Sequence, residues 1–103
     1  MSKPHRKYAI DFDGVIRGWD NELLPGARDA IERIRGAGHR VLIHSCNDPT
    51  FIRQWLNEHG IVVDHVLGES DGKPVAHVYI DDNGLRHISW DDTLNQLTTL
   101  NLI

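Results

Sequence analysis

One short stretch decides the fold: Lys7-Tyr8-Ala9-Ile10-Asp11-Phe12-Asp13-Gly14. Its apolar centre predicts a buried strand over residues 7–12. Asp11 and Asp13 are two residues apart, so both side chains point to the same side of an extended chain. Gly14 lets the backbone turn sharply beneath them. The stretch therefore predicts a strand whose end carries a pair of carboxylates.

Two more predicted strands end in polar side chains. A strand over residues 40–45 ends in Ser45, and a strand over residues 75–80 is followed by Asp81 and Asp82. In an open α/β sheet, ligands bind outside the carboxyl ends of the strands. We therefore expect these side chains to meet the acids of the first strand at one edge of a sheet.

A loop over residues 68–74 adds a cation, Lys73, and the adjacent Pro74 stiffens that loop. Four carboxylates, a hydroxyl and an ammonium at one edge are typical of metal-assisted phosphoryl transfer. The acids can hold a divalent cation, while Ser45 and Lys73 hold phosphate oxygens. Taken alone, Ser45 is more typical of a plain strand end, and Lys73 of a solvated loop cation.

The rest of the chain alternates strand and helix patterns. The predicted helices are 25–36, 48–60 capped by Asp48, and a last one capped by Asp91 or Asp92, and further strands are expected within 61–67 and over 85–89. Strands that alternate with helices imply a mostly parallel sheet with right-handed crossovers. We expect a single domain over residues 1–103: a three-layer α/β sandwich with a mostly parallel sheet of about five strands.

Residues 14–24 predict a loop or small hairpin that projects past the first strand, because they lack a helical period and carry Gly18 and Asn21. This segment is the one local candidate for a flap over the site. Trp19 within it is open to two interpretations. It stacks on a ring or sugar of a substrate, or it packs on the sheet edge or an oligomer contact.

The composition is that of an ordinary globular chain. With 103 residues, 40% of them apolar and 25% charged, the chain is long enough for one core and too short for two. The net charge of −4 and the scattered Lys and Arg residues argue against a large nucleic-acid footprint. A single cysteine, Cys46, excludes an intrachain disulfide framework and favours a reducing compartment.

No sequence feature indicates a membrane protein. The apolar runs fall short of the ~20 residues of a membrane span, and the polar residues 1–7 lack the apolar core of a secretory signal. We therefore expect a cytoplasmic protein without a membrane partner.

At its polar strand ends the chain resembles the haloacid dehalogenase superfamily, whose phosphatases carry four motifs in this order on a Rossmann-like sheet. The matching segments are Asp11-Phe12-Asp13-Gly14-Val15-Ile16, Leu42-Ile43-His44-Ser45, Lys73 and Asp81-Asp82. The resemblance spans residues 8–97, and the order of all four segments is more specific than any one of them. It implies a Mg²⁺-dependent phosphatase.

The resemblance implies a role for each acid. Asp11 is the nucleophile and forms an aspartyl phosphate, while Asp13 donates a proton to the leaving oxygen and later accepts one from the attacking water. Asp11, the backbone carbonyl of Asp13 and one of Asp81 or Asp82 hold Mg²⁺. We favour Asp81 as the direct ligand, with Asp82 orienting it.

Phosphate binding falls to Ser45, Asn47 and Lys73 in the same resemblance. Ser45 donates a hydrogen bond to the phosphate, and Lys73 neutralises charge that builds on the phosphoryl oxygens. Asn47 occupies a place that often touches phosphate in the family. The chain departs from many relatives in one respect: Lys73 lies only eight residues before Asp81, so almost no helix fits between them.

The spacing leaves no room for a cap domain. One helix and its strands nearly fill the 31 residues between Asp13 and Ser45, and the same holds for the 27 residues between Ser45 and Lys73. An uncapped site suits an exposed phosphate on a macromolecule, or a small phosphorylated substrate that a neighbouring subunit of a homo-oligomer covers.

Other functions fit the sequence less well. A phosphoacceptor module of the receiver type uses the same groups, but it begins with its acid pair, ends with its lysine and lacks an acid two residues beyond the phosphorylated aspartate. The intact set of acids weighs against a catalytically silent binding relative. Cysteine chemistry is disfavoured because six residues separate Cys46 from Arg53, whereas cysteine phosphatases have five. Asp48-Pro49 also interrupt the loop that would cradle the phosphate. His44 and His77 are more typical of satisfied histidines than of metal ligands.

Overall fold

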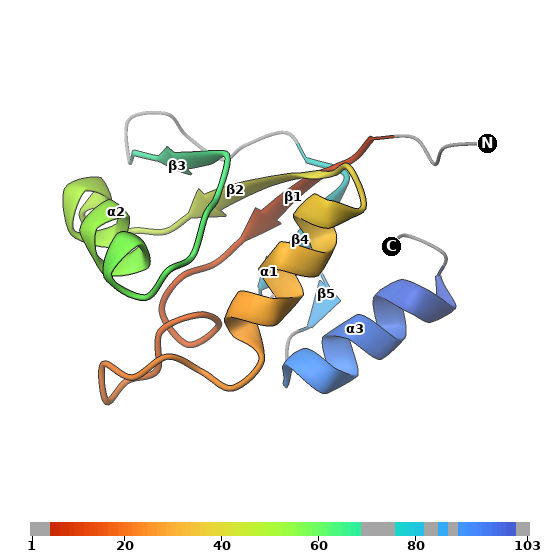
Figure 1. Cartoon of the computed structure of the whole chain (residues 1–103), viewed down its shortest axis with the longest axis horizontal. Coiled ribbons are helices and arrows are strands. Elements are labelled where there is room, and N and C mark those ends of the chain that lie inside the picture. Colours follow the sequence, from red (N-terminus) through yellow and green to blue (C-terminus); the bar gives the residue numbers. More distant parts are fainter. Residues whose placement is uncertain (1–4, 69–75, 82–84, 87–88, 101–103) are drawn as a thin grey trace.

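The computed structural model describes residues 5–68, 76–81, 85–86 and 89–100. These residues form an α/β fold with one sheet and three helices (Figure 1). In chain order the elements are β1 (Lys7–Ile10), α1 (Ala27–Gly36), β2 (Arg40–His44), α2 (Pro49–Glu58), β3 (His65–Leu67), β4 (Val78–Asp81), β5 (Leu85–Arg86) and α3 (Trp90–Thr99). Their order is the alternation that the sequence predicts.

The sheet is parallel, with β1 at its centre. The strand order is β3-β2-β1-β4-β5. Ile10 of β1 lies opposite Ile43 of β2 on one side and Ile80 of β4 on the other. β3, β2, β1 and β4 form the body of the sheet, and the two-residue β5 pairs in parallel with β4. The predicted parallel pairing is confirmed, and the expected count of about five strands is reached only if β5 is included.

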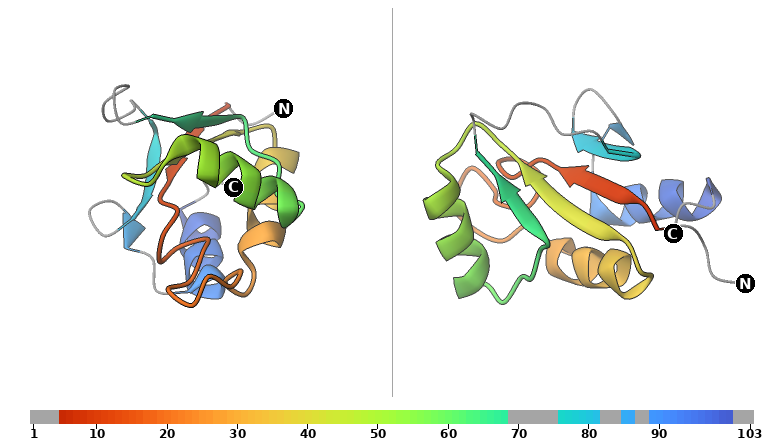
Figure 2. Two further views of the ribbon diagram at one scale, coloured as in Figure 1. Left: turned by 90° about the vertical axis from the view of Figure 1, so that its left-hand side faces the viewer. Right: turned by 90° about the horizontal axis from the view of Figure 1, so that it is seen from above.

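All three helices cover the same face of the sheet (Figures 1 and 2). The crossovers through α1 and α2 both step away from β1 in the direction of β3, and right-handed crossovers that step the same way place their helices on one face. α3 packs against α1 and so joins that layer. Within the described part of the chain, the expectation of three layers is therefore wrong, because the fold has two.

The missing layer follows from the connection between β3 and β4. Ten residues, 68–77, join these two strands. A parallel crossover that contains a helix needs a dozen residues or more. These ten residues are thus too few for a packed helix, and the face of the sheet opposite α1, α2 and α3 receives no helix among the described residues.

The core lies between the sheet and its one helical layer. Alternate strand residues face the helices, and they are buried: Tyr8, Ile10, Val41, Ile43, Val66, Val78 and Ile80. They pack with the apolar faces of the helices, including Ile31, Ile34, Ile52, Trp55 and Leu97. The intervening residues Ala9, Leu42 and Tyr79 point to the other face and lie outside this cluster.

Two helices begin at side-chain caps. Asp48 accepts a hydrogen bond from the Phe51 amide at 3.2 Å, as the sequence predicts for α2. For α3 the predicted caps, Asp91 and Asp92, are wrong. Ser89 caps this helix instead, and its hydroxyl accepts from the Asp92 amide at 3.2 Å. Starting the helix at 90 carries a buried tryptophan into the core, and the two acids occupy the first turn, where they favour the helix dipole.

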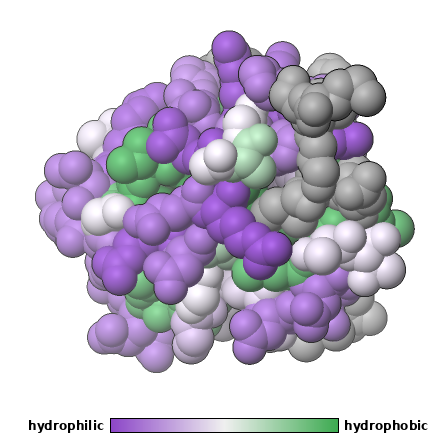
Figure 3. Space-filling view, turned by 45° about the vertical axis from the view of Figure 1, so that its right-hand side comes forward, coloured by the Kyte–Doolittle hydropathy of each residue, from purple (hydrophilic) through white to green (hydrophobic). Residues whose placement is uncertain are grey.

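The face of the molecule in Figure 3 is mainly hydrophilic, and its hydrophobic residues form small separate patches. Such scattered patches are normal on a folded chain. Among the described residues, none of the helices combines the length and the apolar character needed to cross a membrane.

Gly26 sits where α1 meets α3. Its φ is +83°, a left-handed conformation that side chains other than glycine rarely adopt. A Cβ at this position would lie 3.1 Å from the Cβ of Trp90. The Trp90 indole is in turn fixed by its Nε1, which donates to the Val15 carbonyl at 2.9 Å. The close approach of the two helices therefore depends on a residue without a side chain.

We expect Gly26→Ala to lower the free energy of unfolding by about 1–3 kcal/mol, because alanine strains the positive φ and crowds Trp90. Gly36→Ala is the matched control. A Cβ at Gly36 would meet no described atom within 4 Å outside the local helix, and alanine there should raise the free energy of unfolding by up to about 1 kcal/mol. Urea unfolding measures both values. Equal effects of the two substitutions would contradict this packing.

Candidate functional site

Asp11 lies directly beyond β1, on the face of the sheet opposite the helices. Ile10 points into the core, so the alternation of side chains turns Asp11 the other way. Ile10 pairs with Ile43 on one side and Ile80 on the other. The next residue of each strand is Asp11, His44 and Asp81, so Asp11 lies between His44 and Asp81. The Asp11 amide donates to the Ile80 carbonyl at 3.2 Å and so continues the pairing. The predicted meeting of Asp11 and Asp81 is found.

The carboxyl group of Asp11 is held in a half-buried, acidic setting. Its Oδ1 accepts a hydrogen bond from the Phe12 amide at 2.8 Å. Burial raises the pKa of Asp11 above its ordinary value, and the charges of Asp81 and Asp13 add to the rise, whereas the Phe12 amide and His44 oppose it. A carboxylate in this setting is stabilised by a positive charge. The place beside Asp11 is therefore suited to a cation.

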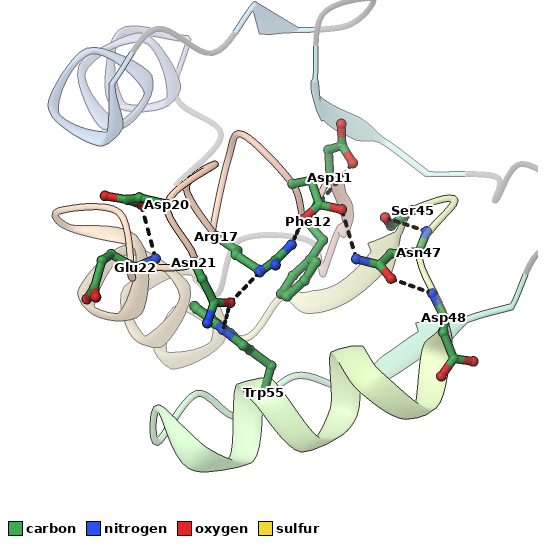
Figure 4. A network of polar contacts seen from close by, with 11 residues as sticks. Asp11, Phe12, Arg17, Asp20, Asn21, Glu22, Ser45, Asn47, Asp48 and Trp55 are labelled. Carbon is green, nitrogen blue, oxygen red and sulfur yellow. Dashed lines mark hydrogen bonds and ion pairs between the residues drawn. The ribbon is translucent and has the colours of Figure 1, made fainter.

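Asp13 is fixed from two sides. The Nη1 of Arg17 donates to its Oδ1 at 2.7 Å, and the Nδ2 of Asn47 donates to its Oδ2 at 3.1 Å. Figure 4 shows Arg17 and Asn47 pointing toward the end of β1 from two different segments. The turn at Gly14, with a φ of +82°, brings Arg17 back beside Asp13. Both oxygens of the Asp13 carboxylate thus have donors, which sets its orientation.

The segment after β2 is ordered by short hydrogen bonds. The Ser45 hydroxyl accepts from the Asn47 amide at 3.1 Å, and the Asn47 side-chain oxygen accepts from the Asp48 amide at 2.8 Å. Asp48 then caps α2. The segment therefore carries Ser45 and Asn47 to the same edge of the sheet as Asp13, as the sequence predicts, and Asn47 touches Asp13 directly.

Residues 14–24 form a small hairpin, which confirms the predicted loop or hairpin. Arg17 and Leu23 pair in an antiparallel bridge, and the Leu24 amide donates to the Ile16 carbonyl at 2.9 Å. The tip is closed by the Gly18 amide, which donates to the Glu22 carbonyl at 2.8 Å. The segment is thus a folded element beyond β1.

The hairpin is tied to α2 through the side chain of Asn21. Its Oδ1 accepts from Arg17 Nε at 2.7 Å and from Trp55 Nε1 at 3.1 Å (Figure 4). The guanidinium of Arg17 also lies 5.1 Å from the centre of the Phe51 ring, within cation–π range. One arginine therefore links Asp13, the hairpin and α2.

Two of the predicted site residues, Lys73 and Asp82, lie outside the described residues. Within the described ranges, no group of three His, Cys, Asp or Glu side chains is arranged to hold a metal ion. Mg²⁺ is usually bound by one or two carboxylates, with waters and substrate phosphates as its other ligands. Asp11 and Asp81 provide two interacting carboxylates. The donor set fits Mg²⁺ of this kind and does not fit an all-protein cage.

Sequence reasoning missed one neighbour of the acids. Arg17 is four residues after Asp13 with a glycine between them, and a tight turn at that glycine was the signal that could have paired them. His44, which the sequence places on a strand beside the site, lies close enough to Asp11 to lower its pKa.

We expect Asp11→Asn to stabilise the metal-free protein at neutral pH. The raised pKa means that the folded state disfavours the Asp11 charge, so removing this charge should raise the free energy of unfolding. The gain should shrink as the pH falls below the raised pKa and vanish below the ordinary value of 3.8, because the wild-type carboxyl is then protonated in both states. Urea unfolding in chelator at several pH values measures this.

Asp64→Asn is the matched control with the opposite sign. Burial alone would raise the pKa of Asp64, but the Val41 amide, at 2.7 Å, and the Arg35 guanidinium outweigh it and lower the pKa. The substitution should therefore destabilise the protein at neutral pH. This loss should disappear as the pH falls through the lowered pKa. Shifts of the same sign in both variants would contradict the electrostatic description of Asp11.

Comparisons with known proteins bear on the fold. No family model matches the chain, and no curated protein matches it. Among solved structures, a conserved protein coded by a locus of Bacteroides thetaiotaomicron is similar, with a TM-score of 0.73 and 19% sequence identity over 95% of this chain and 93% of that chain. At this identity the likeness shows the fold alone. The α/β architecture is thus shared with a known structure.

Proposed function

We propose that this protein is a Mg²⁺-dependent phosphomonoester hydrolase of the haloacid dehalogenase type, which works through an aspartyl phosphate on Asp11. The observation that carries the proposal is the setting of Asp11. This carboxylate stands at the carboxyl edge of the central strand, between His44 and Asp81, and burial together with acidic neighbours raises its pKa. Perturbed acids at such an edge are typical of functional sites.

The order of the four sequence motifs supports the same proposal. Three of them can be located among the described residues, and each follows or ends a strand at one edge of the sheet: Asp11 and Asp13 after β1, Ser45 after β2, and Asp81 in β4. The free thiol of Cys46 is compatible with a reducing compartment, and a cytoplasmic location is part of the proposal.

In the first step, Asp11 attacks the phosphorus of the substrate. Its Oδ1 is engaged by the Phe12 amide, so we assign the attack to Oδ2. A bond forms between Oδ2 and phosphorus while the bond to the leaving oxygen breaks, and the leaving oxygen takes a proton from Asp13. This division of the displacement into two steps is the usual benefit of a covalent nucleophile.

In the second step, water attacks the phosphorus and Asp13 accepts its proton. The bond between phosphorus and Oδ2 breaks, which restores the Asp11 carboxylate and releases inorganic phosphate. Asp13 must be protonated for the first step, and a protonated carboxyl no longer forms an ion pair with Arg17. The proton needs one free carboxyl oxygen, so the reaction requires Asp13 to release either the 2.7 Å contact of Oδ1 with Arg17 or the 3.1 Å contact of Oδ2 with Asn47 when substrate enters.

The remaining groups bind the phosphate and the cation. The Ser45 hydroxyl and the Asn47 amide are assigned to the phosphate oxygens, and Lys73 is assigned to the charge that builds on them. Asp11, the Asp13 backbone carbonyl and Asp81 would hold Mg²⁺, with Asp82 beside them. When bound, Mg²⁺ would neutralise the negative charge of the carboxylates and of the phosphate.

The proposal is tested with a panel of phosphomonoesters: sugar phosphates, nucleoside monophosphates, phosphopeptides and phosphorylated nucleic-acid ends. We expect phosphate release that depends on added Mg²⁺. Asp13→Asn should lower kcat by about 10² to 10⁴, and Asp11→Asn should reduce turnover to background. Asp64→Asn, a charge change outside the site, is the control and should leave turnover intact at a temperature at which the variant is folded.

The panel also separates the rival functions. Equal turnover in wild type, Asp11→Asn and Asp13→Asn would reject the mechanism. Stable phosphorylation of Asp11 without turnover would favour a receiver-type phosphoacceptor. Neither phosphorylation nor turnover with any substrate would favour a catalytically silent relative.

A further inference from the structure

Trp19 presents a large apolar surface at the tip of the hairpin. As a residue, Trp19 is 85% exposed, whereas Trp55 and Trp90 are 4% and 2% exposed. Trp19 therefore does not pack on the sheet edge, which was one interpretation of the sequence. At this exposure, most of the indole surface is available for contact with a ligand.

The indole stands close to the acids. A Cβ at Gly14 would lie 3.3 Å from the Cζ2 of Trp19, so the indole rests beside the backbone directly after Asp13. Three residue steps separate Asp11 from Gly14, so their Cα atoms lie at most about 10 Å apart. A small molecule with a phosphate at Asp11 can therefore reach the indole with its other end.

The hairpin does not need tryptophan for its own folding. Gly18 and Asn21 satisfy the turn: a Cβ at Gly18 would lie 2.7 Å from Asp20 Oδ1, and Asn21 adopts a φ of +68°. The hydrogen bonds to Asn21 fix the hairpin to α2. Trp19 is thus held out by a fixed scaffold, and such preorganisation lowers the entropy that a ligand loses on binding.

The charges around Trp19 restrict the ligand. Asp20 and Glu22 are exposed at the hairpin tip, and the whole chain has a net charge of −4. These charges repel a polyanion such as a nucleic acid strand. A ligand made of an uncharged flat ring and a single phosphate can stack on the indole and is repelled less than a polyanion.

We propose that Trp19 is a stacking platform for the base of a nucleoside monophosphate whose phosphate lies at Asp11. This inference rests on the proposed function, which places the phosphate. Only a pentose separates base and phosphate in such a molecule, which suits the short path from Asp11 to Gly14. Stacking accepts every base because each has a π-face. The protein should therefore strongly prefer phosphates that carry a ring over phosphates without one, and it should discriminate only weakly among different bases.

The test compares adenosine 5′-monophosphate with glycerol 3-phosphate, which lacks a ring, under Mg²⁺. In wild type the kcat/KM ratio of the two should favour the nucleotide, and Trp19→Ala should lower this ratio about tenfold. Trp19→Phe should restore most of the ratio. Val62→Ala, which trims another exposed apolar side chain at 60% exposure, should leave it unchanged. An unchanged ratio in Trp19→Ala would overturn the inference, since a general effect of the hairpin on turnover lowers both activities alike.

A binding measurement keeps the inference separate from the proposed function. Trp19 is the exposed indole, so adenosine monophosphate should quench the red-shifted tryptophan emission of Asp11→Asn and not that of Asp11→Asn with Trp19→Phe. Quenching in Asp11→Asn, combined with a wild-type protein that shows no phosphatase activity, would support stacking and reject the hydrolase. Turnover by wild type without quenching in Asp11→Asn would support the hydrolase and reject stacking. Tighter binding of a 5′-phosphorylated oligonucleotide than of the mononucleotide would overturn the choice of ligand.

Discussion

The parallel pairing of β1 with β2 on one side and β4 on the other is the constraint on which the site depends. Because the three strands run the same way, their carboxyl ends open at one edge, and the register sets Asp11 between His44 and Asp81. A slip of β1 by one residue would turn Asp11 toward the helices and Ile10 away from them. The core that fixes this register therefore also positions the candidate nucleophile.

Because the described helices all cover one face of the sheet, the two faces differ in what they carry. The covered face holds the core, and the face without a described helix carries Asp11 at the end of the central strand. The raised pKa of Asp11 means that the folded state disfavours the charged form of this carboxyl. Carboxyl groups with such shifted pKa values are typical of functional sites. Asp13 differs from Asp11 in that both of its carboxylate oxygens accept side-chain hydrogen bonds, from Arg17 and from Asn47.

Much of the fold and the acids of the site could be predicted from the sequence, because both follow from local patterns. Apolar periodicity located the helices, and polar residues at strand ends located Asp11, Asp13 and Asp81. The third layer was predicted wrongly because the rule that strands alternate with helices ignores length, and residues 68–77 are too few for a helical crossover. The cap of α3 was misplaced because burial of Trp90, a tertiary effect, decides where that helix begins. Arg17 was missed because the turn at Gly14 sets its partner.

Trapping the covalent intermediate tests the central claim most directly. Wild-type protein is mixed with Mg²⁺ and a phosphomonoester that it hydrolyses, quenched in acid within one turnover, digested and analysed by peptide mass spectrometry. The account predicts one phosphoryl group on the peptide that contains Asp11, assigned by fragmentation to that side chain. A phosphoryl group on another residue, or product release in the first turnover without any phosphorylated peptide, would contradict it.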